Sequence, residues 1–454
     1  MNRPAPSARV RGIVPGREIA PPRAFARMLA LSCALALLSA APPGRAQSVV
    51  IGPNGVPVTT SGTTAPRSGG GVSFGGFTLP LAFPGRVETL RDRDVAEAVP
   101  RQWVFTTDGD PAAIAAANGL DLIDTAALQS LGTTLVVVGL RDGEAAEAVA
   151  ARLAQSPDVR DPQPNYVFQT LGEAAPPPRR FVVHGLEAAV ASGADDPATG
   201  ATIAMVDTVV ALEHDALRGA RLTQRVFVAD PVPRAHGTAV AGLIVGTGSE
   251  VPGVARGARL LNFAAFSERR DGVAVATTAS LAKAFDAVAI ARPDVLDLAF
   301  GGREDRLLGR LLDAIDRRGV CMVAAAGNGG ARGRVPFPAS HPAVLAVTAI
   351  DDALKPYAHA TRGDRIDVAA VGVGVFVPVP DGARSAYRRM SGTSMATALV
   401  AGALARAPGC RAAHGPAGLR ALVRDAARDL GAPGHDPVFG DGLFRVPTAT
   451  SRSP

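Results

Sequence analysis

The chain has 454 residues, which suits two or three domains better than one small domain. An apolar content of 47% beside 19% charged residues predicts at least one domain with a sizeable hydrophobic core. The net charge is +6, but the arginines are spread along the chain, and only one Trp and three Tyr occur. A nucleic-acid-binding surface would show a dense basic tract with interleaved aromatic residues, so no nucleic-acid partner is expected.

The N-terminus has the pattern of an export signal. Residues 28–41 form an apolar run, which several arginines precede and Arg45-Ala46-Gln47 follows. A basic region, a short apolar core and small residues predict a cleavable signal peptide, here over residues 1–46. The run has about 14 residues, fewer than the ~20 of a membrane-spanning helix. Export to the periplasm or out of the cell is therefore expected, with a single membrane anchor as the alternative.

Residues 47–98 are rich in Gly, Ser, Thr and Pro and predict a flexible lead-in. In the second unit, residues 99–170, strand and helix patterns alternate. We expect strand, helix, strand, strand, helix and strand, at residues 103–106, 111–118, 120–124, 134–139, 143–153 and 159–163. This order is typical of a small α+β domain of the split βαβ type. A proline-containing linker at residues 171–180 separates it from the third unit.

The third unit, residues 181–447, shows short apolar runs separated by helical patterns; a tail of residues 448–454 follows. Strands without polar alternation are buried on both faces, and helical crossovers make them parallel. Strands are expected at residues 202–206, 259–263, 295–300, 320–325, 344–350 and 366–371, and helices at 238–245, 280–291 and 306–318. This predicts a doubly wound α/β domain with its ligand site at the carboxyl ends of the strands.

Ser394 follows a small-residue turn and precedes the apolar run Met395 to Ala405. A run that is apolar on every face predicts a buried helix, so Ser394 lies at a helix N-terminus. The free N–H groups and the dipole there stabilise developing negative charge, which suits a nucleophile and its oxyanion. The alternative is an ordinary helix cap.

Two further residues complete a candidate catalytic set. Asp207 directly follows a predicted buried strand, and His236 precedes Gly237 at a predicted helix start. Serine needs a base to become a good nucleophile, imidazole titrates in the right range, and a carboxylate orients the imidazole. Each residue alone is also explained as a helix-start residue, so the prediction depends on the three together.

Asn328 ends an apolar strand that begins near Cys321, within Gly327-Asn328-Gly329. This position places its amide at the same strand edge, where an N–H₂ group aimed at an oxyanion would complete the site. Taken alone, Gly-Asn-Gly is better explained as a turn.

Four ordered motifs carry a resemblance to the subtilisin-like serine proteases, the subtilases. They are Ala204-Met205-Val206-Asp207-Thr208, His236-Gly237-Thr238-Ala239-Val240-Ala241-Gly242, Ala324-Ala325-Ala326-Gly327-Asn328 and Ser391-Gly392-Thr393-Ser394-Met395-Ala396. The order Asp, His, Ser is that of subtilisin. The similar region covers about residues 181–446.

The resemblance implies a serine endopeptidase in which Asp207 orients the base, His236 is the base, Ser394 is the nucleophile and Asn328 donates to the oxyanion. It implies that two segments line the cleft and pair with substrate backbone: Ala299-Phe300-Gly301 and Ala325-Ala326-Gly327. It also implies that the second unit, which ends near Asn165-Tyr166-Val167, is an inhibitory propeptide cut between Phe168 and Arg180. A permanent accessory domain is the alternative. The expected partners are protein or peptide substrates and the chain's own propeptide, on a monomer.

This chain departs from the family pattern at a few positions. Ala299 replaces the expected Ser, with Phe300 after it, so no substrate specificity is assigned. No cofactor is expected; calcium stays an open possibility, but no ligands for it are identified. Cys321 and Cys410 remain after signal removal, and we expect two unpaired thiols, because Cys321 lies in an apolar strand. One disulfide between them is the alternative in an exported protein. Alternatives to the protease are a pseudoprotease that binds peptides without cutting them and an esterase with the same triad.

Overall fold

The structure is a computed structural model. It describes residues 98–174, 198–269, 272–382, 384–407 and 415–447, with Leu186 and Cys410. It also describes the backbone of four short earlier strands: β1 (Val50–Ile51), β2 (Pro57–Val58), β3 (Val72–Phe74) and β4 (Phe77–Leu79). These residues all belong to one compact unit. The expected signal peptide, most of the lead-in and linker, and the tail lie outside them. None of the helices described is both long and apolar enough to cross a bilayer.

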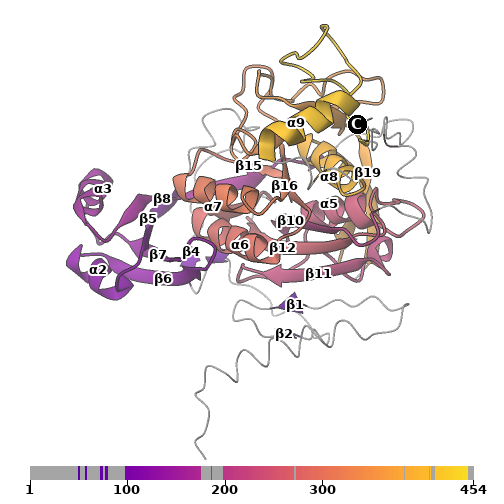
Figure 1. The fold of residues 1–454 in the computed structure, drawn as a ribbon. Coiled ribbons are helices and arrows are strands. Elements are labelled where there is room, and N and C mark those ends of the chain that lie inside the picture. The colour runs from indigo at the N-terminus through magenta and orange to yellow at the C-terminus, as the bar shows by residue number, and fades with distance from the viewer. Residues whose placement is uncertain are drawn as a thin grey trace, which may run out of the picture. The chain divides into compact units, whose positions relative to one another are not determined.

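The N-terminal domain has the split βαβ architecture that the sequence predicts (Figure 1). Its strands lie in the order β8-β5-β7-β6, and all neighbours are antiparallel. The elements in chain order are β5 (Ala98–Thr107), α2 (Pro111–Ala117), β6 (Asp121–Leu128), β7 (Thr133–Gly139), α3 (Ala146–Gln155) and β8 (Arg160–Thr170). Helix α2 begins where predicted, because Asp110 accepts a hydrogen bond from the Ala112 N–H and Pro111 suits the first helical turn.

The third unit is a doubly wound domain around a parallel sheet, as predicted. Seven parallel strands lie in the order β18-β17-β16-β14-β10-β12-β11. Their bounds are β10 (Thr202–Thr208), β11 (Arg221–Val226), β12 (Arg259–Glu268), β14 (Val295–Leu298), β16 (Cys321–Ala325), β17 (Val344–Ile350) and β18 (Val368–Val371). Most of these strands are buried along their whole length, which explains their apolar sequences.

Helices cover both faces of this sheet. Helices α5 (Ala235–Val245) and α8 (Thr393–Leu404) belong to the hydrophobic cluster on one face. Helices α6 (Thr278–Ala291) and α7 (Arg306–Asp316) belong to the cluster on the other face. Because α8 is buried at every position, its sequence lacks the polar stripe of a surface helix.

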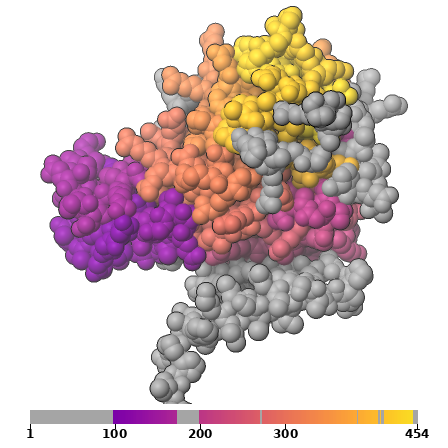
Figure 2. Space-filling view, in the orientation of Figure 1, coloured from indigo at the N-terminus to yellow at the C-terminus, as the bar shows by residue number. Residues whose placement is uncertain are grey.

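The N-terminal domain packs on the face that α6 and α7 cover. Leu128, Leu135 and Val137 of this domain share a buried cluster with these helices. Figure 2 shows its indigo and purple atoms in contact with the orange atoms of the third unit. Asp286 on α6 accepts a 2.7 Å hydrogen bond from the Ser130 N–H. The interface therefore combines apolar packing with directional contacts.

The predicted strand at residues 295–300 is divided into β14 and β15 (Phe300–Gly301). The sequence did not predict several other elements: β13 (Ala274–Thr277), the hairpin β19 (Val375–Asp381) and β20 (Arg384–Ser391), helix α9 (Gly415–Ala426), and the edge strand β11. Strand β11 reads Arg-Leu-Thr-Gln-Arg-Val and β19 contains two prolines, so neither has the continuous apolar run used to find the others.

The expectation of two free thiols is wrong for this structure, because Cys321 and Cys410 form a disulfide with a Cα–Cα distance of 6.3 Å. Helix α8 begins at the carboxyl edge of the sheet and runs back across it. Its end at Leu404 therefore approaches the amino end of β16, where Cys321 is the first residue. Only this three-dimensional path brings Cys410 to a residue 89 positions away.

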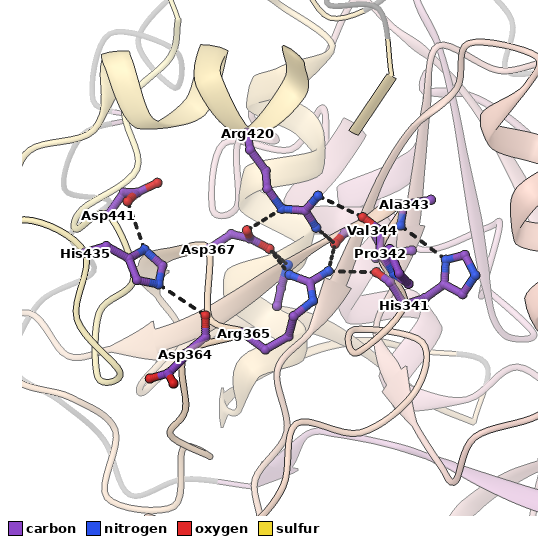
Figure 3. Close-up of polar contacts among 11 residues, drawn as sticks. His341, Pro342, Ala343, Val344, Asp364, Arg365, Asp367, Arg420, His435 and Asp441 are labelled. Carbon is purple, nitrogen blue, oxygen red and sulfur yellow. Dashed lines mark hydrogen bonds and ion pairs between the residues drawn. The ribbon is translucent and has the colours of Figure 1, made fainter. Parts of the chain in front are cut away.

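Helix α9 is fixed to the sheet edge through one carboxylate (Figure 3). Asp367 accepts hydrogen bonds from Arg365 Nη1 at 2.7 Å and from Arg420 Nε at 2.8 Å. Both guanidinium groups also donate to the Val344 carbonyl. This network joins α9 to β17 and β18.

Candidate active site

Asp207 and His236 lie together at the carboxyl edge of the sheet. Asp207 is near the end of β10, and His236 is in the first turn of α5. The His236 Nδ1 atom is 2.9 Å from both carboxylate oxygens of Asp207. Both side chains are buried, with exposed fractions of 6% for His236 and 1% for Asp207. When Nδ1 carries the proton, this contact leaves Nε2 as the acceptor.

Neighbouring backbone groups hold this pair in place. The Thr208 N–H donates to Asp207 Oδ1 at 2.6 Å, and the Gly237 N–H donates to Thr208 Oγ1 at 2.9 Å. A Cβ atom on Gly237 would lie 2.6 Å from the Thr208 carbonyl oxygen, which explains the glycine after His236. Asn262 of β12 donates to that same carbonyl at 3.0 Å. Sequence reasoning missed Thr208 and Asn262 as supports, because only the fold brings them together.

Ser394 lies at the start of α8, as predicted, with Gly392 as the N-cap residue. Its hydroxyl donates to the Ala299 carbonyl at 2.7 Å. The predicted contact between this hydroxyl and the imidazole is therefore not made here. His236 Nε2 is buried and has no hydrogen-bond partner among the described residues.

Asn328 directs its amide at a carbonyl from the N-terminal region. Its Nδ2 atom donates to the Leu171 carbonyl oxygen at 2.9 Å. The Ser394 N–H points to the same oxygen at 3.5 Å. The orientation of the amide is set by Thr393, whose N–H and hydroxyl both donate to Asn328 Oδ1, at 3.1 and 3.0 Å. Two donors from separate elements thus converge on one carbonyl oxygen.

This carbonyl belongs to a strand that crosses the whole site. Before Leu171, strand β8 pairs antiparallel with β13 and with β15, where Gln169 lies opposite both Val275 and Gly301. After it, β9 (Glu173–Ala174) pairs antiparallel with β20. Gly172 lies beside the imidazole, because a Cβ atom on it would be 3.2 Å from His236 Nε2. The peptide bond between Leu171 and Gly172 therefore sits between Ser394 and His236.

The two predicted cleft segments have different roles in the structure. Phe300 and Gly301 pair with this strand, and Ala299 accepts from the Leu171 N–H at 3.4 Å. The second edge beside this strand is β13 and not the segment Ala325 to Gly327, whose pairing with a substrate stays a prediction. Ala325 pairs within the parallel sheet. The N–H groups of Ala326 and Gly327 donate to Val347 and Thr393.

Phe168, three residues before Leu171, fills an aromatic pocket. Its side chain is fully buried, and its ring centroid lies 6.3 Å from that of Phe300 and 6.4 Å from that of Phe337. Gly302 gives the ring its space, since a Cβ atom there would lie 2.1 Å from Phe168 Cδ1. The departure at Phe300 noted in the sequence therefore shapes this pocket.

Within the described ranges, no three His, Cys, Asp or Glu side chains form a group that could hold a metal ion.

An Asp–His pair and a helix-terminal serine at the carboxyl edge of a doubly wound parallel sheet define an α/β protein with the site geometry of a serine hydrolase. The model of the subtilase family matches residues 198–442, more than half of the chain. This chain belongs to the subtilase family.

Individual relatives agree with this assignment. The minor extracellular protease Epr of Bacillus subtilis (strain 168) is 30% identical over 215 residues, which are 46% of this chain and 32% of Epr. Subtilisin Savinase of Lederbergia lenta is 28% identical over 256 residues, which are 56% of this chain and 91% of Savinase. The cuticle-degrading serine protease of Arthrobotrys oligospora is 32% identical over 220 residues. The chain spans about a third of Epr and about half of the Arthrobotrys protease (32% and 52%).

The fold is also found in a solved structure. Fervidolysin from Fervidobacterium pennivorans, described as a keratinolytic enzyme related to subtilisin, matches with a TM-score of 0.66 at 21% sequence identity. The match covers 79% of this chain and 61% of fervidolysin. At this identity the likeness is one of fold.

Proposed function

We propose that this chain is a serine endopeptidase made as an inactive precursor, and that the bond between Leu171 and Gly172 is its own processing site. The observation that carries the proposal is the Leu171 carbonyl oxygen, which faces both Asn328 Nδ2 and the Ser394 N–H. Donors placed at a carbonyl oxygen stabilise the negative charge that it acquires when a nucleophile attacks its carbon.

In the proposed reaction, the Ser394 hydroxyl turns from the Ala299 carbonyl toward His236 Nε2 and attacks the Leu171 carbonyl carbon. His236 accepts the hydroxyl proton, and Asp207 stabilises the imidazolium through Nδ1–H. Collapse of the oxyanion breaks the C–N bond, and His236 returns the proton to the leaving Gly172 amine. Water then enters, transfers a proton to His236 and attacks the acyl carbon. His236 returns this proton to Ser394 Oγ as the ester C–O bond breaks, which releases the new carboxyl end and restores the free enzyme.

The same contacts explain how the N-terminal domain would act as an intramolecular inhibitor. Its last strand occupies both edges of the cleft, so a second peptide has no free strand edge to join. Tyr166 N–H donates to Thr278 Oγ1 at 3.1 Å, and Asn165 Oδ1 accepts from the Ala279 N–H at 3.1 Å, which satisfies an N–H group in the first turn of α6. Ion pairs of Asp124 with Lys283 and of Asp161 with Arg310 attach the rest of the N-terminal domain to helices α6 and α7.

The preferred substrates are then extended peptides with an aromatic residue four positions before the cut bond, as Phe168 is in the precursor. Backbone pairing gives affinity with little sequence demand, whereas the pocket at Phe300, Phe337 and Gly302 adds a side-chain requirement. Strand β20 would receive the residues after the cut, as it receives β9.

Replacing Phe168 with alanine is expected to slow self-processing and weaken docking of the N-terminal domain. Truncating a fully buried phenylalanine costs about 3–5 kcal/mol, here in the docked strand. The measurement is the rate of precursor cleavage, followed on gels. Gln169→Ala is the control, because residue 169 pairs through its backbone and its side chain is only half-buried. Equal rates for both variants would contradict a role for the aromatic pocket.

The proposed protease is secreted or periplasmic. It acts as a monomer on protein or peptide substrates and not on nucleic acid. The signal-like pattern of residues 1–46 supports export. Relatives named extracellular or cuticle-degrading proteases agree with that setting.

The decisive experiment is to purify the exported precursor, incubate it, and sequence the N-terminus of the product. We expect a new chain that begins at Gly172, digests casein, and is labelled at Ser394 by a fluorophosphonate. Peptide binding without turnover would replace the proposal with a pseudoprotease. Turnover of small esters without cleavage of casein would replace it with an esterase.

A further inference from the structure

Asp297 is a buried acid that the proposed reaction does not use. It lies in the central strand β14, with no exposed surface, and neither of its carboxyl oxygens has a hydrogen-bond partner among the described residues. Other buried acids of the domain are paired: Asp305 accepts from the Leu308 N–H and the Thr278 hydroxyl, and Asp367 binds two arginines. An unpartnered buried carboxyl is costly, so its presence beside a catalytic site calls for a function.

Asp297 lies on the same face of the sheet as Asp207. Strands β10 and β14 are adjacent and parallel, with Met205 opposite Asp297, and Asp207 is two residues beyond Met205. Side chains alternate along a strand, so Met205 and Asp207 point to one face. Val295 and Ala299, two residues on either side of Asp297, belong to the cluster with Met205 and helices α5 and α8. Two carboxyl groups therefore share this buried layer on neighbouring strands.

Only one of the two carboxyl groups has partners that stabilise a negative charge. Asp207 receives the imidazole and the Thr208 N–H, whereas Asp297 receives neither a cation nor a donor among the described residues. Burial raises the pKa of Asp297 well above its usual range, and the charge of Asp207 raises it further. Asp297 therefore keeps its proton to a higher pH than an ordinary aspartate does.

No other charge compensates Asp297 from the described elements around it. Asp207 is the only titratable residue of β10, and His236 is the only one of α5. Strand β16 places Val323 opposite Asp297 and contains no titratable group apart from the disulfide-bonded Cys321. Helix α8 contains no titratable side chain. Among these described elements, the ionisable groups of the layer are therefore Asp207, His236 and Asp297.

We propose that Asp297 is a positioning residue that acts through Asp207. As a neutral carboxylic acid, it leaves the Asp207–His236 pair with a single negative charge. As a carboxylate, it would place a second, unpaired negative charge beside this pair. This charge would favour the imidazolium form of His236, which cannot accept the Ser394 proton. It would also disturb β14 just before Ala299 and Phe300. The inference rests on the proposed function, since it assigns His236 as the base.

The direction of the pH dependence follows from proton binding. Asp297 keeps its proton in the folded protein at pH values where the unfolded chain, with an ordinary aspartate, has lost it. The folded state then binds more protons, so stability falls as pH rises from the unfolded pKa to the raised folded pKa. A neutral isostere removes this penalty. Asp297 thereby limits the stability of the folded protein at alkaline pH, whereas an asparagine at the same position would not.

The test compares mature wild-type protein with Asp297→Asn, and with Asp425→Asn as a matched control, because the Asp425 side chain is 75% exposed. We expect equal kcat/KM near neutral pH. At alkaline pH, the wild type and the control should lose about tenfold in kcat/KM per pH unit once Asp297 ionises. Asp297→Asn should hold its plateau to higher pH and unfold at a higher temperature there. Superimposable profiles, or a folded but inactive Asp297→Asn at neutral pH, would overturn the inference.

A second measurement does not require activity. Difference infrared spectroscopy of the Ser394→Ala precursor at neutral pH should show the carbonyl band of a protonated carboxylic acid, and adding Asp297→Asn should remove it. If Asp297→Asn does not fold, Asp297→Ser takes its place in both experiments. If the Ser394→Ala precursor shows this band but the mature wild type has no proteolytic activity, the proposed protease is rejected and the protonated Asp297 is kept. If the mature wild type is active but the precursor lacks the band, the inference about Asp297 is rejected and the protease is kept.

Discussion

Replacing Ser394 with alanine is expected to leave the Leu171–Gly172 bond uncut and to abolish proteolysis. The Ser394 hydroxyl is the nucleophile of the proposed reaction, and the Ser394 backbone N–H points at the Leu171 carbonyl oxygen. Loss of the nucleophile in subtilisin lowers kcat by about 10⁶, and we expect an effect of that order here. The measurement is the amount of intact precursor over time, together with the rate of casein hydrolysis.

The fold should survive this change. Ser394 donates only one side-chain hydrogen bond, to the Ala299 carbonyl, so a small residue fits the buried start of α8. Ser385→Ala is a suitable control, because this hydroxyl lies on the β20 strand and accepts from the Asp215 N–H. Cleavage at Leu171–Gly172 by purified Ser394→Ala, with no other protease present, would show that another group performs the reaction.

Replacing Asn328 with alanine is expected to lower kcat by about 10²–10³, with a small change in KM. In subtilisin itself, loss of the corresponding amide costs about 2.7–4 kcal/mol in the transition state. Asn328 Nδ2 is the closer of the two donors to the Leu171 carbonyl, at 2.9 Å against 3.5 Å for the Ser394 N–H. Most of the stabilisation of the oxyanion therefore depends on it. The check is steady-state kinetics on a peptide that carries the Phe168–Gly172 sequence.

Asn328→Asp separates the effect of hydrogen-bond donation by the side chain from the effect of its size. A carboxylate has nearly the same size as the amide but donates no hydrogen bond and repels an oxyanion. It also keeps acceptor oxygens for the Thr393 N–H and hydroxyl. We expect Asn328→Asp to be at least as impaired as Asn328→Ala. Near-normal turnover by either variant would mean that the oxyanion forms elsewhere.

The architecture was predictable because its central strands and one helix are buried on all sides. Strands such as β16 and β17 and helix α8 are continuous apolar runs, and such runs have few alternatives in a large α/β domain. Turn residues at their ends marked the carboxyl edge, where Asp207, Asn328 and the start of α8 lie. Elements without such runs, including β11, β13 and the β19–β20 hairpin, were missed, because their positions depend on neighbours and not on their own periodicity.

Tertiary structure decided what no local pattern contains. It placed Leu171 against Asn328, paired β8 with β13 instead of with residues 325–327, and joined Cys321 to Cys410. It also left Asp297 without a hydrogen-bond partner among the described residues, one strand away from Asp207, which its apolar neighbours in the sequence do not reveal. The sequence by itself determined the layers, the family motifs and the residue types of the site. The contacts between those residues join segments far apart in the chain, so only the folded structure specifies their distances and hence their chemistry.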